Sequence, residues 1–143
     1  MTVRLGTPDD VPRAIEIWRN AVDATHAFLT PEDRAEIDCI VSDEFLPKAE
    51  MWIATDTLNR PVGFLVMDGE TIDALFVDPA FHGQGFGTEL LDHALSLSPN
   101  ATVDASEQAD NALPFYLARG FRMVGRSDTD GQGRAYPLIH LSR

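Results

Sequence analysis

The strongest structural signal in the chain is the stretch Val77–Leu91, which reads VDPAFHGQGFGTELL. Gly83, Gly85 and Gly87 alternate between an apolar run typical of a strand and an apolar run typical of a helix. Without Cβ atoms, the backbone N–H groups of this loop can approach a ligand closely. The helix that follows adds its own unpaired N–H groups and the positive end of its dipole. The stretch therefore predicts an anion site suited to a diphosphate.

Spacing excludes the common nucleotide-binding loops. A dinucleotide-binding G-x-G-x-x-G would need its last glycine at Thr88 or Leu90, and a Walker loop needs a lysine after its glycines. A second run, Asp128–Gly133, resembles the start of a calcium loop, but Ile139 stands where the last carboxylate ligand should be. We expect a hairpin turn there.

Composition limits the classes of function. With 143 residues, 44% hydrophobic and 24% charged, the chain is expected to form one domain over residues 1–143. A net charge of -12 argues against nucleic-acid binding and favours a cationic substrate such as an amine, although it also serves solubility.

No sequence feature predicts a membrane segment, a secretion signal or a metal site. Apolar runs are too short to span a bilayer, and the single cysteine, Cys39, agrees with a cytoplasmic protein. His93 and His140 share no metal-ligand spacing with Cys39, so no metal is expected.

Apolar periodicity and turn residues predict alternating strands and helices. Thr7-Pro8 and Thr30-Pro31 are typical helix starts, and Gly120 is a typical helix end. The expected strands cover residues 3–5, 51–54, 61–67, 71–77, 101–104, 121–125 and 136–141. The expected helices begin at residues 8 and 31, follow the glycine loop to about residue 97, and cover residues 111–119.

The glycine stretch resembles the acyl-CoA loop of the GNAT superfamily of N-acetyltransferases, (Arg/Gln)-x-x-Gly-x-(Gly/Ala). His82 stands at the Arg/Gln place, Gly85 at the invariant glycine and Gly87 at the small residue. A second family motif is matched by Asn111-x-x-x-Phe115-Tyr116-x-x-x-Gly120-Phe121, in which Pro114 replaces the usual alanine. The segment 22–29, VDATHAFL, is similar to that of small stand-alone bacterial members, the YjaB-like N-acetyltransferases.

The resemblance covers essentially the whole chain and implies an α/β fold, classed as α+β in some schemes. A GNAT fold has a central mixed sheet, here of six to seven strands, flanked by about four helices. The sheet splays between its two parallel central strands. The implied activity is transfer of an acetyl group from acetyl-CoA to a primary amine, by direct attack in a ternary complex. The acceptor would be a small molecule, a peptide or a protein lysine, and the protein a monomer or a homodimer.

The resemblance also implies where coenzyme A binds. The backbone from His82 to Thr88 would hold the diphosphate, and the strand edge would pair with the pantetheine arm. The Leu75 N–H is our candidate donor to the thioester carbonyl. The full set of expected cofactor-binding residues is Leu75, Phe76, Val77, His82, Gly83, Gln84, Gly85, Phe86, Gly87, Thr88, Asn111 and Phe115.

Catalysis needs an acid for the departing thiolate and a base for the attacking ammonium. Tyr116 occupies the family's general-acid position, although a buried tyrosine can also be purely structural. Asp73, two residues before Leu75 and expected on the same strand face, is our candidate base. Glu107 and a chain of water molecules are alternatives.

The acceptor pocket is expected near the end of the first helix, with Trp18, His26 and Phe28 as candidate lining residues. Each of them also has a purely structural interpretation as a packed side chain. Two other functions stay open at this stage: a non-catalytic acyl-CoA sensor on the same fold, and a nucleotide-binding regulator.

Overall fold

The computed structural model describes residues 2–143. Its strands are β1 (Thr2–Leu5), β2 (Met51–Thr55), β3 (Pro61–Asp68), β4 (Thr71–Val77), β5 (Thr102–Ser106), β6 (Arg122–Ser127) and β7 (Leu138–Ser142). Its helices are α1 (Val11–Thr25), α2 (Pro31–Ile40), α3 (Phe86–Leu97) and α4 (Ala112–Ala118). The predicted order of elements is confirmed, with most boundaries moved by one to two residues.

The strands form one mixed sheet in the order β1-β2-β3-β4-β5-β7-β6. All neighbouring strands are antiparallel except β4 and β5, which are parallel. Parallel strands need a long crossover connection, and the glycine loop together with α3 forms the crossover between β4 and β5. The predicted mixed sheet with two parallel central strands is therefore confirmed.

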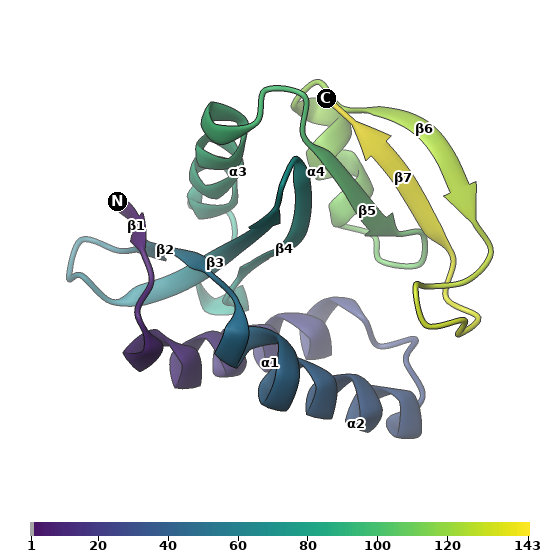
Figure 1. Cartoon of the computed structure of the whole chain (residues 1–143), viewed down its shortest axis with the longest axis horizontal. Helices are drawn as coiled ribbons and strands as arrows, with labels where there is room; N and C mark the ends of the chain where they lie inside the picture. The colour runs from purple at the N-terminus through teal and green to yellow at the C-terminus, as the bar shows by residue number, and fades with distance from the viewer. Residues whose placement is uncertain (1) are drawn as a thin grey trace.

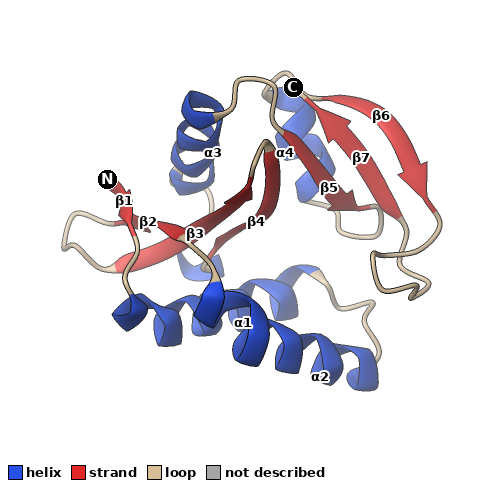
Figure 2. Ribbon diagram, in the orientation of Figure 1, coloured by secondary structure: helices blue, strands red, loops and turns tan. Residues whose placement is uncertain are grey.

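Helices cover both faces of the sheet (Figures 1 and 2). Helices α3 and α4 lie on one face, and α1 and α2 lie on the other. Side chains of β4 alternate between the two cores: Leu75 and Val77 pack toward α3, whereas Ala74 and Phe76 pack toward α1. Strand β4 is therefore buried from both sides, which explains its nearly continuous apolar sequence.

Helix α2 begins at its predicted capping residue, whereas the start predicted at Thr7-Pro8 is a 3-10 turn and α1 itself begins at Val11. The backbone N–H of Thr7 donates to the Asp10 carboxylate, and a short 3-10 turn precedes α1. The Thr30 hydroxyl accepts from the backbone N–H of Asp33 and caps α2. Helix α2 was expected to end near Pro47, but it ends at Ile40, where the chain continues as a π-helical segment and then a 3-10 turn up to Lys48.

Within residues 2–143, no helix has both the length and the apolar content needed to cross a bilayer.

Candidate active site

Strands β4 and β5 pair only at their first residues. Thr71 lies opposite Thr102 and Ile72 lies opposite Val103, and beyond this level the strands separate. A cavity of about 150 Å³ lies where they diverge, lined by Asp73 to Val77 from β4 and by Val103 to Ser106 from β5. The separation leaves one edge of β4 without a strand partner beyond Ile72. A substrate with amide groups can form hydrogen bonds with such an edge as an additional strand would.

The glycine loop forms an open cradle at the end of β4. Gly85 has a φ of 91° and caps α3, a left-handed conformation that glycine adopts without the steric cost of a Cβ. The first intrahelical bond of α3 runs from the Glu89 N–H to the Gly85 carbonyl, at 3.0 Å. The N–H groups of the preceding helical residues therefore point out of the helix N-terminus, toward a second cavity of about 420 Å³.

His82 holds the loop against the strand. Its Nε2 lies 2.8 Å from the Val77 carbonyl oxygen, so Nε2–H is the donor in this bond. The ring lines both cavities, at the place where the family pattern has Arg or Gln. The replacement of Arg or Gln by His82 therefore does not disrupt the backbone cradle.

Most of the other residues predicted to bind the cofactor through this loop line the second cavity, but one of them does not. Gly83, Gly85, Gly87 and Thr88 line the second cavity. Phe86 lines it as well, but only 3% of this residue is exposed and it belongs mainly to the core. Gln84 is exposed and is not part of the wall of either cavity.

Arg119 is a site residue that sequence reasoning missed. Its Nε and Nη2 donate to the Thr88 hydroxyl oxygen at 3.1 and 2.7 Å, and its Nη1 donates to the Phe115 carbonyl at 2.8 Å. The guanidinium carbon lies 4.0 Å from the centre of the Phe115 ring, a cation–π contact. A fixed positive charge therefore lies in the wall of the second cavity, next to the helix N-terminus. No local pattern marks this role, because the bond to Thr88 joins positions 31 residues apart in the chain.

Tyr116 lies where the two cavities meet, because it lines both of them. The residue is only 6% exposed, and its ring packs edge-on against Phe115 and Phe121 at centroid distances of 5.1 and 5.2 Å. Burial raises the pKa of its hydroxyl, so the proton stays on oxygen at neutral pH. Among residues 2–143 the hydroxyl has no hydrogen-bond partner, which leaves it available to a ligand.

Asn111 also lines both cavities. It precedes α4, but its side chain makes no capping hydrogen bond to that helix.

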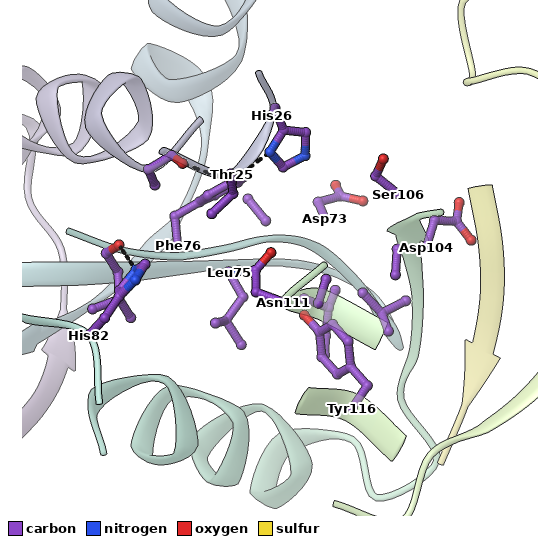
Figure 3. A pocket seen from close by; sticks show the side chains of 17 residues that line it. Thr25, His26, Asp73, Leu75, Phe76, His82, Asp104, Ser106, Asn111 and Tyr116 are labelled. Atoms are coloured by element: carbon purple, nitrogen blue, oxygen red, sulfur yellow. Dashed lines mark hydrogen bonds between the residues drawn. The ribbon is translucent and has the colours of Figure 1, made fainter. Parts of the chain in front are cut away.

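Asp73 lies at an irregularity of β4 that the sequence did not reveal. Ala74 pairs with Val66 and Ile72 pairs with Met67, so Asp73 is an extra residue without its own partner on β3. The expectation that Asp73 shares a face with Leu75 is wrong, because the extra residue shifts the alternation. Figure 3 shows Asp73 on the side of Thr25 and His26, with Leu75 and Tyr116 on the other side of β4. Partial burial, and then the charge of Asp68, raise the pKa of Asp73.

The α1–α2 connection closes the cavity on the Asp73 side. His26 lines the cavity, and its Nδ1 lies 2.7 Å from the Thr25 hydroxyl. Burial lowers the pKa of the His26 ring, which favours the neutral imidazole. Phe28 packs against His26 at a centroid distance of 5.2 Å and does not line the cavity itself.

Two candidates lie away from the cavity. Trp18 is 5% exposed and packs in the core between α1 and the sheet, so it does not form a wall of the acceptor pocket. Glu107 accepts two hydrogen bonds from Arg126, at 2.7 and 3.0 Å, and does not reach the cavity wall.

Cys39 lies exposed in α2, away from the cavity. Among the described residues, no group of three or more His, Cys, Asp or Glu side chains is arranged to hold a metal ion.

Comparison with known proteins tests the family. Residues 29–136 match the acetyltransferase (GNAT) domain family, which is more than half of the chain. The chain belongs to the GNAT family. It is 45% identical to the peptidyl-lysine N-acetyltransferase YjaB of Salmonella typhimurium, over 99% of this chain and 97% of that protein. It is 40% identical to YjaB of Escherichia coli, over 99% of this chain and 96% of that protein.

Solved structures agree with this GNAT assignment. The solution structure of apo YjaB from Escherichia coli matches with a TM-score of 0.91, covering 99% of this chain and 97% of that one. The PaiA N-acetyltransferase of Thermoplasma acidophilum, solved with coenzyme A, matches with a TM-score of 0.75 at 18% identity, which supports the shared fold. The chain is therefore an N-acetyltransferase with the GNAT fold, and the enzyme interpretation is favoured over a non-catalytic sensor.

Proposed function

We propose that this enzyme transfers the acetyl group of acetyl-CoA to the ε-amine of lysine residues in polypeptides, by direct attack in a ternary complex. It would act in the cytoplasm, as a single domain, and as a monomer or a homodimer. The observation that carries the proposal is the position of Tyr116 in the wall of two adjoining cavities. One cavity has the features of a donor site and the other those of an acceptor site, so two substrates would meet beside the same hydroxyl.

The donor side suits coenzyme A. The diphosphate would bind the N–H groups from Gly83 to Thr88 and the positive end of α3. Arg119 adds a formal positive charge to the same wall. The amide-rich pantetheine arm would pair with the free edge of β4 at Leu75, Phe76 and Val77, next to Asn111 and Phe115.

The acceptor side suits an ammonium group. Asp73 on β4 and Asp104 on β5 line the cavity at the first level at which those strands no longer pair. The Asp104 carboxylate is bonded to Nδ1 of His140, so Asp73 is the carboxylate that would receive the ammonium. The chain also carries a net charge of -12, which would attract a cationic polypeptide. The named relatives are peptidyl-lysine N-acetyltransferases, which supports lysine as the acceptor class.

In the transfer step, the free amine attacks the thioester carbonyl carbon. The Leu75 N–H would stabilise the negative charge that develops on the carbonyl oxygen. The C–S bond then breaks, and Tyr116, which stays protonated because burial raises its pKa, donates to the leaving sulfur. Asp73 would hold the acceptor nitrogen on the opposite side of β4 and assist its deprotonation.

The test is release of free thiol from acetyl-CoA with a panel of lysine peptides and small amines, with mass spectrometry to locate the acetyl group. We expect the lysine peptides to react. The variant Tyr116→Phe should reduce kcat by about 100-fold, the usual effect of a general acid, and leave the Kd for coenzyme A unchanged.

An Asp92→Asn variant is the matched control, because Asp92 is exposed on α3 and lies outside both cavities. Turnover by Tyr116→Phe at the wild-type rate would remove Tyr116 from the mechanism. Absence of turnover with every amine, together with intact coenzyme A binding, would favour the sensor alternative instead.

A further inference from the structure

A group able to take the ammonium proton lies at the C-terminal end of α1. The Thr25 hydroxyl lies 2.8 Å from the Ala21 carbonyl oxygen, which can only accept, so the hydroxyl proton is used in that bond. The same oxygen lies 2.7 Å from Nδ1 of His26 and must accept there. Nδ1 therefore carries the hydrogen, and in a neutral ring Nε2 keeps its lone pair.

The free nitrogen of His26 belongs to the acceptor cavity. His26 lines this cavity together with Asp73, and Figure 3 shows the ring on the Asp73 side of β4. No residue in the described chain forms a hydrogen bond with Nε2, which leaves the lone pair available to a bound ammonium. The unpartnered Tyr116 hydroxyl lines the same cavity from the opposite side of β4.

We propose that His26 is the general base of the reaction, and that Thr25 is a positioning residue that fixes its tautomer. This inference rests on the proposed function, because it assigns a role in the transfer to lysine. It revises the part of Asp73, whose carboxylate would hold the ammonium by charge while the imidazole takes the proton.

Each proton moved in the transfer has a donor and an acceptor. The lysine ammonium gives one proton to Nε2 of His26, and the resulting amine forms the new C–N bond. The adduct nitrogen then loses a second proton to water, the sulfur takes the hydroxyl proton of Tyr116, and water returns a proton to the Tyr116 oxygen. The products are an acetylated lysine, coenzyme A with its free thiol, and one proton that leaves His26 for solvent. No oxidant or further reactant is required.

The other titratable groups that line the cavity suit this role. They are Asp73 on β4, Asp104 on β5, Tyr116 on α4 and His82 in the glycine loop. Asp73 would stabilise the imidazolium once it forms, whereas the Asp104 carboxylate is already bonded to Nδ1 of His140 on β7. Partial burial lowers the pKa of His26 below its ordinary value of 6.5, so the ring is ready to accept a proton at neutral pH.

The first test is His26→Ala with and without added imidazole. We expect kcat for a lysine peptide to fall about 100-fold, with KM for acetyl-CoA unchanged, and millimolar imidazole to restore part of the loss. Imidazole should not help Asp73→Asn or the Asp92→Asn control. A folded His26→Ala variant that keeps the wild-type kcat, or that loses activity without any rescue, would overturn the proposal.

The second test is the pH dependence of kcat. The base acts only when neutral, so wild-type kcat should fall as the pH drops through the pKa of His26. Asp73→Asn should keep this acidic limb and His26→Ala should lose it. An acidic limb that persists in His26→Ala and disappears in Asp73→Asn would assign the base to Asp73.

The third test needs no turnover. Nitrogen NMR of the His26 ring should show hydrogen on Nδ1 in the wild type, and a mixture of tautomers in Thr25→Val. Thr25→Ser should keep the wild-type tautomer and kcat. A ring with hydrogen on Nε2 would overturn the inference even in an active enzyme, whereas failure of the proposed function would appear as wild-type protein that acetylates no lysine peptide.

Discussion

Arg119 joins the two sequence motifs through one side chain. Its guanidinium bonds to Thr88 at the start of α3 and covers the Phe115 ring on α4. These contacts use only part of its hydrogen-bonding capacity, and the charge itself is not paired with a carboxylate in the described chain. The residue is therefore placed to bind a phosphate as well as to link two helices.

Replacing Arg119 tests this double role. The variant Arg119→Gln should raise KM for acetyl-CoA about tenfold, because a charge-assisted contact to the diphosphate is lost, and should leave KM for the lysine peptide unchanged. Steady-state kinetics in both substrates measures the effect. Arg122→Gln, at an exposed arginine on β6, is the control. Equal increases in both KM values would mean that Arg119 only stabilises the fold.

Asp10 is a pH-sensitive residue of the fold. Arg4 donates to both carboxylate oxygens at 2.9 Å, and this pair, against the opposing effect of burial, lowers the pKa of Asp10 from 3.8 to about 2. A carboxylate with a lowered pKa stabilises the fold above its unfolded pKa, and this stabilisation is lost as the pH falls through the folded pKa.

The variant Asp10→Asn should therefore lower the free energy of unfolding at pH 7 by about 1–2 kcal/mol, reduced from the full linkage value because Arg4 is partly solvated. The difference from wild type should shrink as the pH falls from 3.8 to about 2. Thermal unfolding across this range measures it, with Asp9→Asn as an exposed neighbour for control. A difference that does not change with pH would rule out the ion pair as its source.

At the scale of elements, the N-terminus of α3 depends on one backbone conformation. Gly85 has positive φ, so an added Cβ is strained there whatever space surrounds it. Gly85→Ala should lower the free energy of unfolding by about 1 kcal/mol and weaken coenzyme A binding, because the loop must shift.

The matched control is Gly131→Ala. Gly131 has no positive φ, and an added Cβ would meet no atom within 4 Å. Chemical denaturation and calorimetric titration with coenzyme A give both quantities. Coenzyme A affinity equal to wild type in Gly85→Ala would show that the cradle tolerates a different loop conformation.

Strand β4 shows what an element's sequence does and does not determine. Its apolar residues and the glycines that follow are enough to predict a buried strand that leads into an anion site. The extra residue at Asp73 has no local signal, because it depends on how β4 aligns with β3. The prediction of the strand was therefore confirmed, while the predicted direction of Asp73 was wrong.

At the scale of the whole molecule, segments distant in sequence enclose the acceptor cavity. The Tyr136 hydroxyl, before β7, donates to the Asp33 carboxylate at 2.5 Å and accepts from the Thr30 N–H at 3.2 Å. The Tyr136 ring packs against Phe28 at a centroid distance of 5.9 Å, and Phe28 in turn packs against His26. The loop before β7 thereby supports the wall that carries His26.

Removing the Tyr136 hydroxyl should loosen this wall. We expect Tyr136→Phe, which loses both of these hydrogen bonds, to raise KM for the lysine peptide about threefold, with little change in KM for acetyl-CoA. Ser96→Ala, which removes an exposed hydroxyl on α3, is the control. A larger change in KM for acetyl-CoA than for the peptide would contradict the arrangement.

The sequence by itself determined the order of elements, the glycine cradle and the position of Tyr116 in its motif. These properties depend on short-range patterns: apolar periodicity, capping residues and glycines at fixed spacing. Only the tertiary structure decided that Trp18 is core, that Asp73 faces His26, that Arg119 lies beside the helix N-terminus, and that Thr25 sets the tautomer of His26. The physical reason is that the direction of a side chain depends on strand alignment and on contacts between segments far apart in the chain.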